Sequence, residues 1–355
     1  MKYLKGLVSR VAHSHPETLT LSEGARQQKI LTDCINSIKA IERKASDCYA
    51  GKDYAAELGD EFVKMLVLDG CFIVELFRKY AEEVKREHDD PIFSMSCMLQ
   101  FLHHDLILLE NQIPWFVLQT LFDITKLPSD TKSLIELALH FFATMFTFDT
   151  IPLKPAIFND QDIKHILDLL RLSLVLPSKE INNYGRKLGW QPIWSITKLK
   201  EAGVKFEKSD KAESILDIKF RKKGVLEIPL FLIQETTETI FRNLIAYEQC
   251  LPNCPPIITS YAMLLDNLID SPNDLDMLCN KNIIWDNWLT TGDATQFFNE
   301  LYNDTYVKEF YYYELCRDLN NYCKDGWPKF LRALGDCCPD LRCYHSFSHI
   351  VANFL

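Results

Sequence analysis

Four ionisable side chains fall inside apolar helical runs, where they could form a metal site or an acid–base site. Asp69 and Glu75 lie in one run, and His103 and Glu110 lie in another, seven residues apart. Seven residues make about two helical turns, so His103 and Glu110 share a helix face. Imidazole and carboxylate groups together could bind a divalent cation. We favour a structural network, because buried polar groups are almost always hydrogen-bonded, and we predict no metal and no cofactor. An unrecognised enzyme or small-ligand site at these four residues is the alternative.

A second group of metal-binding side-chain types lies near the C-terminus. It comprises Cys337, Cys338, Cys343, His345 and His349. Thiolates and imidazoles bind zinc tetrahedrally, and structural zinc sites usually pair their ligands at short, fixed intervals. This segment has no Cys-x-x-Cys and no matching second half. We therefore expect residues 336–355 to be a tail of uncertain order rather than a zinc site.

The chain lacks the motifs that mark the common catalytic and nucleotide-binding sites. It has no phosphate loop, no Gly-x-Gly-x-x-Gly turn, no Gly-x-Ser-x-Gly elbow and no His-Glu-x-x-His helix. The segment around Asp105 differs from a kinase catalytic loop, because His104 replaces the arginine and Asn111 is one residue too distant. We predict no catalytic residues.

The charge balance argues against nucleic acid as a partner. With 39 basic and 49 acidic residues, the net charge is −10. A negative chain is repelled by phosphate backbones. The basic cluster of Lys219 and Arg221 to Lys223 is short. We interpret it as a solvated turn, with an anionic contact surface as the alternative.

Composition and periodicity predict a mainly α fold. Glycine is scarce, at 12 of 355 residues, which disfavours Gly-rich sheet architectures. Apolar residues recur at helical spacing along most of the chain. The expected helices cover residues 2–11, 22–48, 60–86, 94–111, 115–122, 134–146, 160–174, 238–250, 257–269, 273–280, 293–302, 306–324 and 327–334.

One region departs from the helical pattern. Apolar and polar residues alternate at 215–220 and again at 225–228, where Pro229 stops the run. Alternation of this kind predicts a small antiparallel sheet of two or three strands near residues 200–230. We expect a helical lobe over 1–190, followed by the sheet and further helices over 191–335, packed as one continuous body.

The cysteines and the apolar runs indicate a soluble, intracellular or membrane-associated chain. Several of the 12 cysteines, such as Cys71 and Cys97, lie in apolar helical runs and are expected to be reduced. The first ten residues do not form a signal peptide. Charged residues interrupt every long apolar run, and none reaches 18 residues.

Blocks of sequence in a fixed order resemble a plant family of unknown function, DUF247 (also called UPF0481). The first block is Met65 to Leu76, which reads MLVLDGCFIVEL. The others are His104 to Leu106 with Leu109 to Pro114, then Leu199 to Phe206 with Leu216 to Phe220 and Leu226 to Pro229, then Phe241 to Gln249. Together they span roughly residues 1 to 330.

The resemblance implies a plant protein without an assigned catalytic activity. Some relatives are implicated in pollen self-incompatibility and other reproductive recognition, and members typically end in a C-terminal transmembrane helix. This chain departs from that pattern at both ends. It lacks the family's leading segment, and after Trp327 it has residues 336–355 where relatives carry the membrane helix. We therefore expect no membrane span in this chain.

These observations favour a recognition or signalling protein that acts through contacts with an unknown protein partner. Tyrosine supplies a large contact area at low rotamer cost and is enriched in interfaces. Aromatic residues crowd the segment around Tyr311 and Tyr312. We expect one of these two rings to point outward beside the basic turn at Arg221, forming the partner contact.

If no helix of this chain spans a membrane, carbonate should extract it from membranes. A charged residue at the centre of a membrane helix costs about 2.5–3.5 kcal/mol, and residues such as Lys64, Asp69 and Glu136 interrupt the apolar runs. The measurement is carbonate extraction of membranes from cells that express the chain. Retention in the pellet would reveal a span or a lipid anchor.

Overall fold

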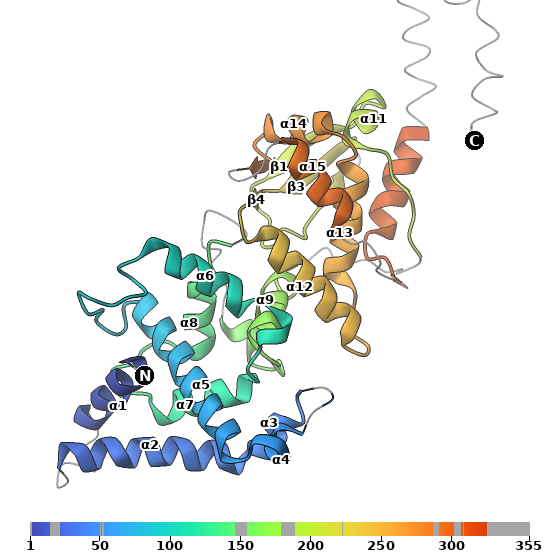
Figure 1. Cartoon of the computed structure of the whole chain (residues 1–355). Coiled ribbons are helices and arrows are strands. Elements are labelled where there is room, and N and C mark those ends of the chain that lie inside the picture. The colour runs from blue at the N-terminus through green and yellow to red at the C-terminus, as the bar shows by residue number, and fades with distance from the viewer. Residues whose placement is uncertain are drawn as a thin grey trace, which may run out of the picture. The chain divides into compact units, whose positions relative to one another are not determined.

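The structure is a computed structural model that describes residues 2–14, 22–49, 51, 53–145, 155–178, 189–221, 223–286, 291–301, 307 and 309–324. The fold is mainly α with a small mixed sheet, which confirms the predicted fold class (Figure 1). The chain forms two compact units, Met1–Pro177 with Glu235–Cys250, and Ser178–Gln234 with Leu251–Leu355. Residues 235–250 thus belong with the N-terminal helices, although they follow the sheet in the sequence.

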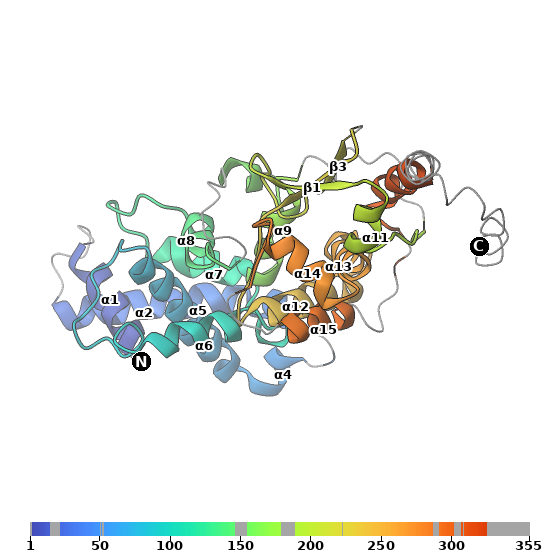
Figure 2. The same cartoon turned by 90° about the horizontal axis from the view of Figure 1, so that it is seen from above.

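In the described residues of the first unit, all of the regular secondary structure is helical (Figure 2). Its α-helices are α1 (Lys2–Ser14), α2 (Glu23–Ala40), α3 (Glu42–Ser46), α4 (Tyr54–Leu58), α5 (Asp60–Tyr80), α6 (Ser96–Leu106), α7 (Trp115–Ile124), α8 (Leu134–Phe141), α9 (Ile166–Val175) and α12 (Thr237–Cys250). Two short 3₁₀ helices, η2 (Leu109–Asn111) and η3 (Pro155–Phe158), complete it.

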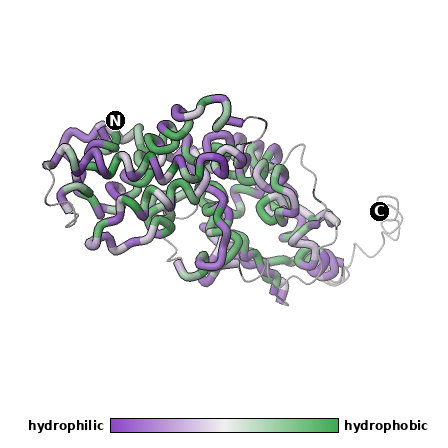
Figure 3. The backbone as a smooth tube through the Cα atoms, turned by 90° about the horizontal axis from the view of Figure 1, so that it is seen from below, coloured by the Kyte–Doolittle hydropathy of each residue, from purple (hydrophilic) through white to green (hydrophobic). Residues whose placement is uncertain are grey.

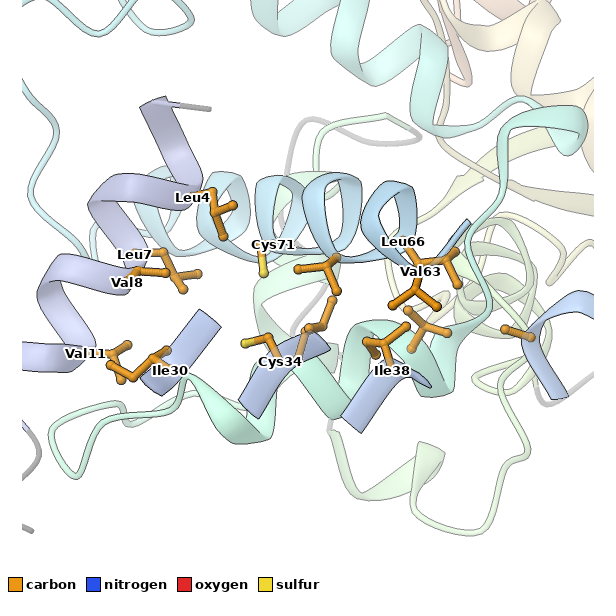
Figure 4. Packing of buried hydrophobic residues seen from close by; sticks show 14 of the residues in the cluster. Leu4, Leu7, Val8, Val11, Ile30, Cys34, Ile38, Val63, Leu66 and Cys71 are labelled. Atoms are coloured by element: carbon orange, nitrogen blue, oxygen red, sulfur yellow. The ribbon is translucent and has the colours of Figure 1, made fainter. Parts of the chain in front are cut away.

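Helix α5 is the central element of this unit and packs against α1, α2, α7 and α8. Its inner face joins α1 and α2 in one apolar cluster, to which α1 contributes Leu7 and Val11, α2 contributes Ile38, and α5 contributes Leu66 (Figure 4). The thiols of Cys34 and Cys71 point toward each other in the same cluster (Figure 4). Both cysteines are free and buried, whereas Cys97 on α6 is exposed.

Local signals in the sequence set several helix boundaries. The Ser22 side chain accepts from Ala25 N at the start of α2, as N-cap residues do. Ser133 and Glu136 form a capping box at α8, in which each side chain bonds the other residue's backbone N–H. The α5 helix ends at Tyr80, earlier than expected, because Arg86 folds back and donates to the carbonyls of Lys79 and Tyr80.

The second unit combines helices with two small sheets. Its helices are α11 (Ile196–Glu201), α13 (Ile257–Leu268), α14 (Pro272–Cys279), α15 (Thr291–Glu300) and a helix over residues 313–324. Its strands are β1 (Lys205–Ser209), β2 (Lys219–Arg221), β3 (Val225–Pro229), β4 (Phe231–Ile233) and β5 (Ile284–Asp286). The expected helix over 327–334 and the tail over 336–355 lie outside the described residues.

The larger sheet has the order β1-β3-β2 and differs from the expected antiparallel sheet. The β2–β3 hairpin is antiparallel, with Phe220 opposite Leu226, but β1 runs parallel to β3, with Phe206 also beside Leu226. Residues 210–218 between β1 and β2 are long enough to carry the chain past the position of β3, which then lies between the other two strands. Alternation in the sequence specifies which side chains are buried, not the direction of the neighbouring strand.

A separate parallel pair, β4–β5, was not predicted from the sequence. Its register places Leu232 opposite Trp285. Each strand has only three residues, too few for an alternating pattern to stand out. The partner strands are also far apart in the chain, which periodicity cannot detect.

The packing of α5 on α7 predicts that Gly70→Ala destabilises the first unit. A Cβ at Gly70 would lie 2.5 Å from Leu121 Cδ1, whose side chain is buried. Alanine gains about 1 kcal/mol in helix propensity, but overpacking a core costs about 1–3 kcal/mol. We expect a net loss of about 1 kcal/mol in the free energy of unfolding, measured by urea denaturation.

The matched control is Gly6→Ala in α1, where a Cβ would have no atom within 4 Å. This variant should be as stable as the wild type or more stable, because it gains propensity without a clash. If Gly70→Ala gained as much stability as Gly6→Ala, the helix contact would have room that the structure does not indicate.

Candidate functional site

The charges buried in the C-terminal half of α5 are paired with neighbouring elements. One carboxylate oxygen of Glu75, which is 1% exposed, accepts from Arg10 Nη2 at 2.7 Å. Arg78 is fully buried, donates to Thr125 Oγ1 at 3.0 Å and lies 3.4 Å from Asp130. Burial lowers the pKa of Arg78 to about 10, so it stays protonated at neutral pH. Because an unpaired buried charge is strongly destabilising, these pairs hold α1 and the α7–α8 loop on α5.

A third buried ion pair anchors the loop that follows α5 to the end of that helix. Lys79 Nζ lies 2.8 Å from Asp90 Oδ2, and Tyr3 Oη donates to Asp90 Oδ1 at 2.9 Å. The ammonium of Lys79 also lies 4.3 Å from the centroid of the Tyr3 ring. Burial alone would raise the pKa of Asp90, but the bonds from Lys79, Tyr3 and Ile92 N hold it below its ordinary value. The Asp90 carboxylate is therefore ionised, and both of its oxygens accept hydrogen bonds.

Two of the sequence blocks that carry the family resemblance meet where α6 ends. Leu109 N donates to Asn243 Oδ1 of α12 at 2.7 Å. The Asn243 amide in turn donates to Thr239 O at 2.8 Å, and Thr239 Oγ1 lies 3.2 Å from His104 Nε2. The Asn243 side chain thus supplies the acceptor for Leu109 N that a backbone carbonyl would have supplied if α6 had continued. This explains why the expected helix over 94–111 breaks after Leu106.

Gln112 ties the same turn to α9. Its side-chain amide donates to Leu106 O at 3.0 Å and to Leu108 O at 2.7 Å, and its Oε1 accepts from Leu167 N at 3.1 Å. Tyr49 Oη donates to the Gln112 carbonyl at 3.1 Å. One side chain therefore satisfies backbone groups on both sides of the bend.

Helices α9 and α12 carry a further buried ion pair. Arg171 Nε lies 2.9 Å from Glu248 Oε1, and both side chains are almost inaccessible. Nearby, His165 Nδ1 accepts from Asp168 N at the start of α9, and its ring contacts Tyr247 edge to face. Burial lowers the pKa of His165 to about 4 against the opposing effect of Asp168. The imidazole is therefore neutral and acts as a helix cap.

The four residues predicted as a buried network do not assemble into one. Asp69 and Glu110 are exposed, Glu75 pairs with Arg10, and His103 Nε2 lies 3.0 Å from Phe141 O. Burial lowers the pKa of His103, and partial desolvation on the helix surface raises that of Asp69. Within the described residues, no hydrogen bond or ion pair joins any two of the four. The expectation that His103 and Glu110 share a helix face is wrong, because α6 ends at Leu106.

The predicted partner contact at Tyr311 and Tyr312 is also wrong, because both rings are buried. Tyr312 Oη donates to Leu216 O at 2.8 Å, and Tyr311 N donates to Ser260 Oγ at 3.2 Å. The helix over residues 313–324 begins only after them, so both precede it in a turn that faces the core.

A different tyrosine, Tyr322, packs against the basic turn near Arg221. A Cβ at Gly224, whose φ is +77°, would collide with the phenol of Tyr322, and the Tyr322 ring packs edge to face on Phe220. Arg221 itself pairs with Glu227 on the neighbouring strand at 2.8 Å. Lys222 and the C-terminal cysteine and histidine group lie outside the described residues. In the part of the chain that the structure describes, no group of three or more His, Cys, Asp or Glu side chains could hold a metal ion.

Arg10, Arg78, Gln112 and Asn243 were missed by sequence reasoning, although they position the elements. Two of them, Gln112 and Asn243, lie inside the blocks that carry the resemblance. Their position inside these blocks was the feature of the sequence that could have identified them. What the sequence did not indicate is that each one reaches across to an element far away in the chain.

These features define a mainly α protein in which the sequence blocks that carry the resemblance contribute to a buried scaffold. The sequence matches the family described as a plant protein of unknown function, DUF247, over residues 11–336. The chain therefore belongs to this family, as the resemblance predicted.

Two curated relatives come from Arabidopsis thaliana. UPF0481 protein At3g47200 is 29% identical over 298 residues, which cover 77% of this chain and 62% of the relative. Putative UPF0481 protein At3g02645 is 26% identical over 137 residues, which cover 38% of this chain and 26% of the relative. The chain thus spans less than two thirds of the length of either relative. No solved structure matches the chain.

Hydrophobic and hydrophilic residues alternate along the helices (Figure 3). Among the described residues, no helix combines the length and the hydropathy that crossing a bilayer requires.

The junction of α6 and α12 predicts that Asn243→Ala destabilises the first unit. The change leaves Leu109 N without its acceptor, whereas Thr239 O keeps the backbone N–H donor that the helix supplies. A buried polar group without a partner costs about 1–3 kcal/mol. We expect a loss of that size in the free energy of unfolding, measured by urea denaturation.

The neighbouring Arg242→Ala is the control, since among the described residues Arg242 pairs only with Glu238, on the exposed side of α12. A surface change of this kind usually stays within about 0.5 kcal/mol. Equal stability of the two alanine variants would contradict the role assigned to Asn243.

Proposed function

We propose that this chain is a non-enzymatic plant recognition or signalling protein that binds a protein partner through its second unit. The observation that carries the proposal is a pair of exposed indoles in one short segment. Trp190 is 46% exposed and Trp194 is 38% exposed. Tryptophan is enriched among the residues that dominate binding energy at protein interfaces.

The segment that bears these two rings is anchored by its other residues. Ile193 and Ser195 are buried on either side of Trp194. Asn320 of the helix over 313–324 donates to Pro192 O at 2.9 Å. The indoles are thereby presented on a fixed backbone, and a fixed backbone lowers the ordering cost of binding.

The buried ionisable groups support a contact function over a catalytic one. Glu75, Asp90 and Glu248 each accept a hydrogen bond from a neighbouring basic side chain, and His165 caps a helix. Catalytic groups need open access to a substrate and a pKa matched to the reaction. The names of the curated relatives state no enzymatic activity.

Reproductive self-recognition is the process that we propose for this contact. The support is the family resemblance, since some relatives are implicated in pollen self-incompatibility. The match covers 62% of one relative's length, so a process known for whole relatives comes to this chain only as a proposal.

Substituting both Trp190 and Trp194 by alanine should reduce partner recovery by at least about tenfold. The measurement is affinity purification from floral and leaf tissue with quantitative mass spectrometry, comparing variant with wild type. Trp285→Ala, at a ring in the same unit that is 44% exposed, is the matched control. The thermal midpoint should be unchanged in the double variant.

Two results would count against the proposal. Equal recovery of the same partners by wild type and double variant would remove the indoles from the interface. Partners recovered from leaf but absent from floral tissue would argue against a reproductive process.

A further inference from the structure

The N-terminal half of α5 leaves one helix face uncovered. Met65 and Leu68 are 41% and 37% exposed, and Phe72 further along is partly buried, with its ring centroid 5.2 Å from that of Tyr3 in α1. These three residues are spaced by three and then four positions, which is the spacing of a coiled-coil seam. The opposite face of the same turns, with Leu66 and Val67, is buried in the unit's own core.

Opposite charges flank this seam on its two sides. With Met65 and Phe72 as a positions and Leu68 as d, Lys64 takes a g position and Asp69 an e position. Asp69 forms no hydrogen bond or ion pair with any residue that the structure describes. Lys64 bonds only Glu61 of the same helix, at 2.5 Å, and its side chain is 55% exposed. Partial desolvation on the helix surface raises the pKa of Asp69, and a cation from a partner would offset that cost.

We propose that α5 pairs with α5 of a second copy of this chain in a parallel, two-fold symmetric arrangement. Met65, Leu68 and Phe72 of the two copies form three apolar layers. Lys64 of each copy bonds the partner's Asp69, since a g residue in a parallel pair faces the e residue five positions later.

The charge pattern selects this orientation. In an antiparallel pair, g positions face g positions and e positions face e positions, which would bring Lys64 near the partner's Lys64. Asp69 would then lie near the partner's Asp69, and like charges across an interface are unfavourable. In a parallel pair, Lys64 of each copy faces the partner's Asp69, so the same attractive contact forms twice, as a two-fold symmetric interface requires.

The interface is short, which makes the dimer weak and dependent on concentration. Three apolar layers bury less than a standard interface of about 1,600 Å². This surface belongs to the first unit and does not depend on the indoles of the proposed function.

Sedimentation velocity over about 1–100 µM chain tests the proposal. We expect a monomer–dimer equilibrium for the wild type. Lys64→Glu and Asp69→Lys should each weaken dimerisation by at least about tenfold, because each places like charges across the interface. The double variant with both changes should dimerise within about threefold of the wild type, because its charges are complementary again.

Two further variants separate this face from other surfaces. Leu68→Lys should abolish the dimer, since it puts a charge in the central layer. Phe101→Ser on α6, at a ring that is 61% exposed, should leave the dimer unchanged. Circular dichroism checks that each variant stays folded.

Three outcomes would overturn the proposal. The wild type could remain monomeric over the whole range, or the single charge variants could dimerise as the wild type does. The double variant could also fail to recover. None of these results bears on partner capture through Trp190 and Trp194, so the two proposals can fail separately.

Discussion

The first unit depends on the burial of one long helix that carries charges into the core. In α5, Glu75, Arg78 and Lys79 are all buried within two turns. Each needs a partner, since desolvating an unpaired charge costs far more than a single apolar contact returns. The partners come from α1, from the loop after α5 and from the loop after α7. The need to pair these charges therefore fixes where three other segments lie.

The same constraint gives a physical meaning to the sequence blocks that define the family. The first block is the middle of α5, where Gly70 allows Leu121 of α7 to approach closely. Two later blocks meet through Asn243 and Leu109, at the bend that ends α6. These blocks encode a scaffold of close helix contacts and satisfied polar groups. A sequence match to them therefore reports the architecture and leaves the activity open.

Function on such a scaffold depends on what its surface presents. The two proposals use different units and different chemistry, an indole pair near Trp194 and a charged apolar stripe along α5. Both rest on apolar or aromatic side chains that remain exposed. An isolated exposed apolar residue is ordinary. A stripe with heptad spacing and complementary flanking charges carries more information, because it specifies both a partner and an orientation.

The sequence by itself determined the fold class, most helix positions and the family. Helical spacing is a local property, and capping residues such as Ser22 and Ser133 act within four residues, so both can be read from the chain. The sequence did not determine which polar residues would meet. Glu110 left the face of His103 because Asn243, more than a hundred positions away, ends the helix between them. The Tyr312 ring lies inward with its hydroxyl donating to Leu216 O, and the backbone of Tyr311 is held by Ser260. Burial and pairing of this kind depend on long-range contacts, which only the tertiary structure decides.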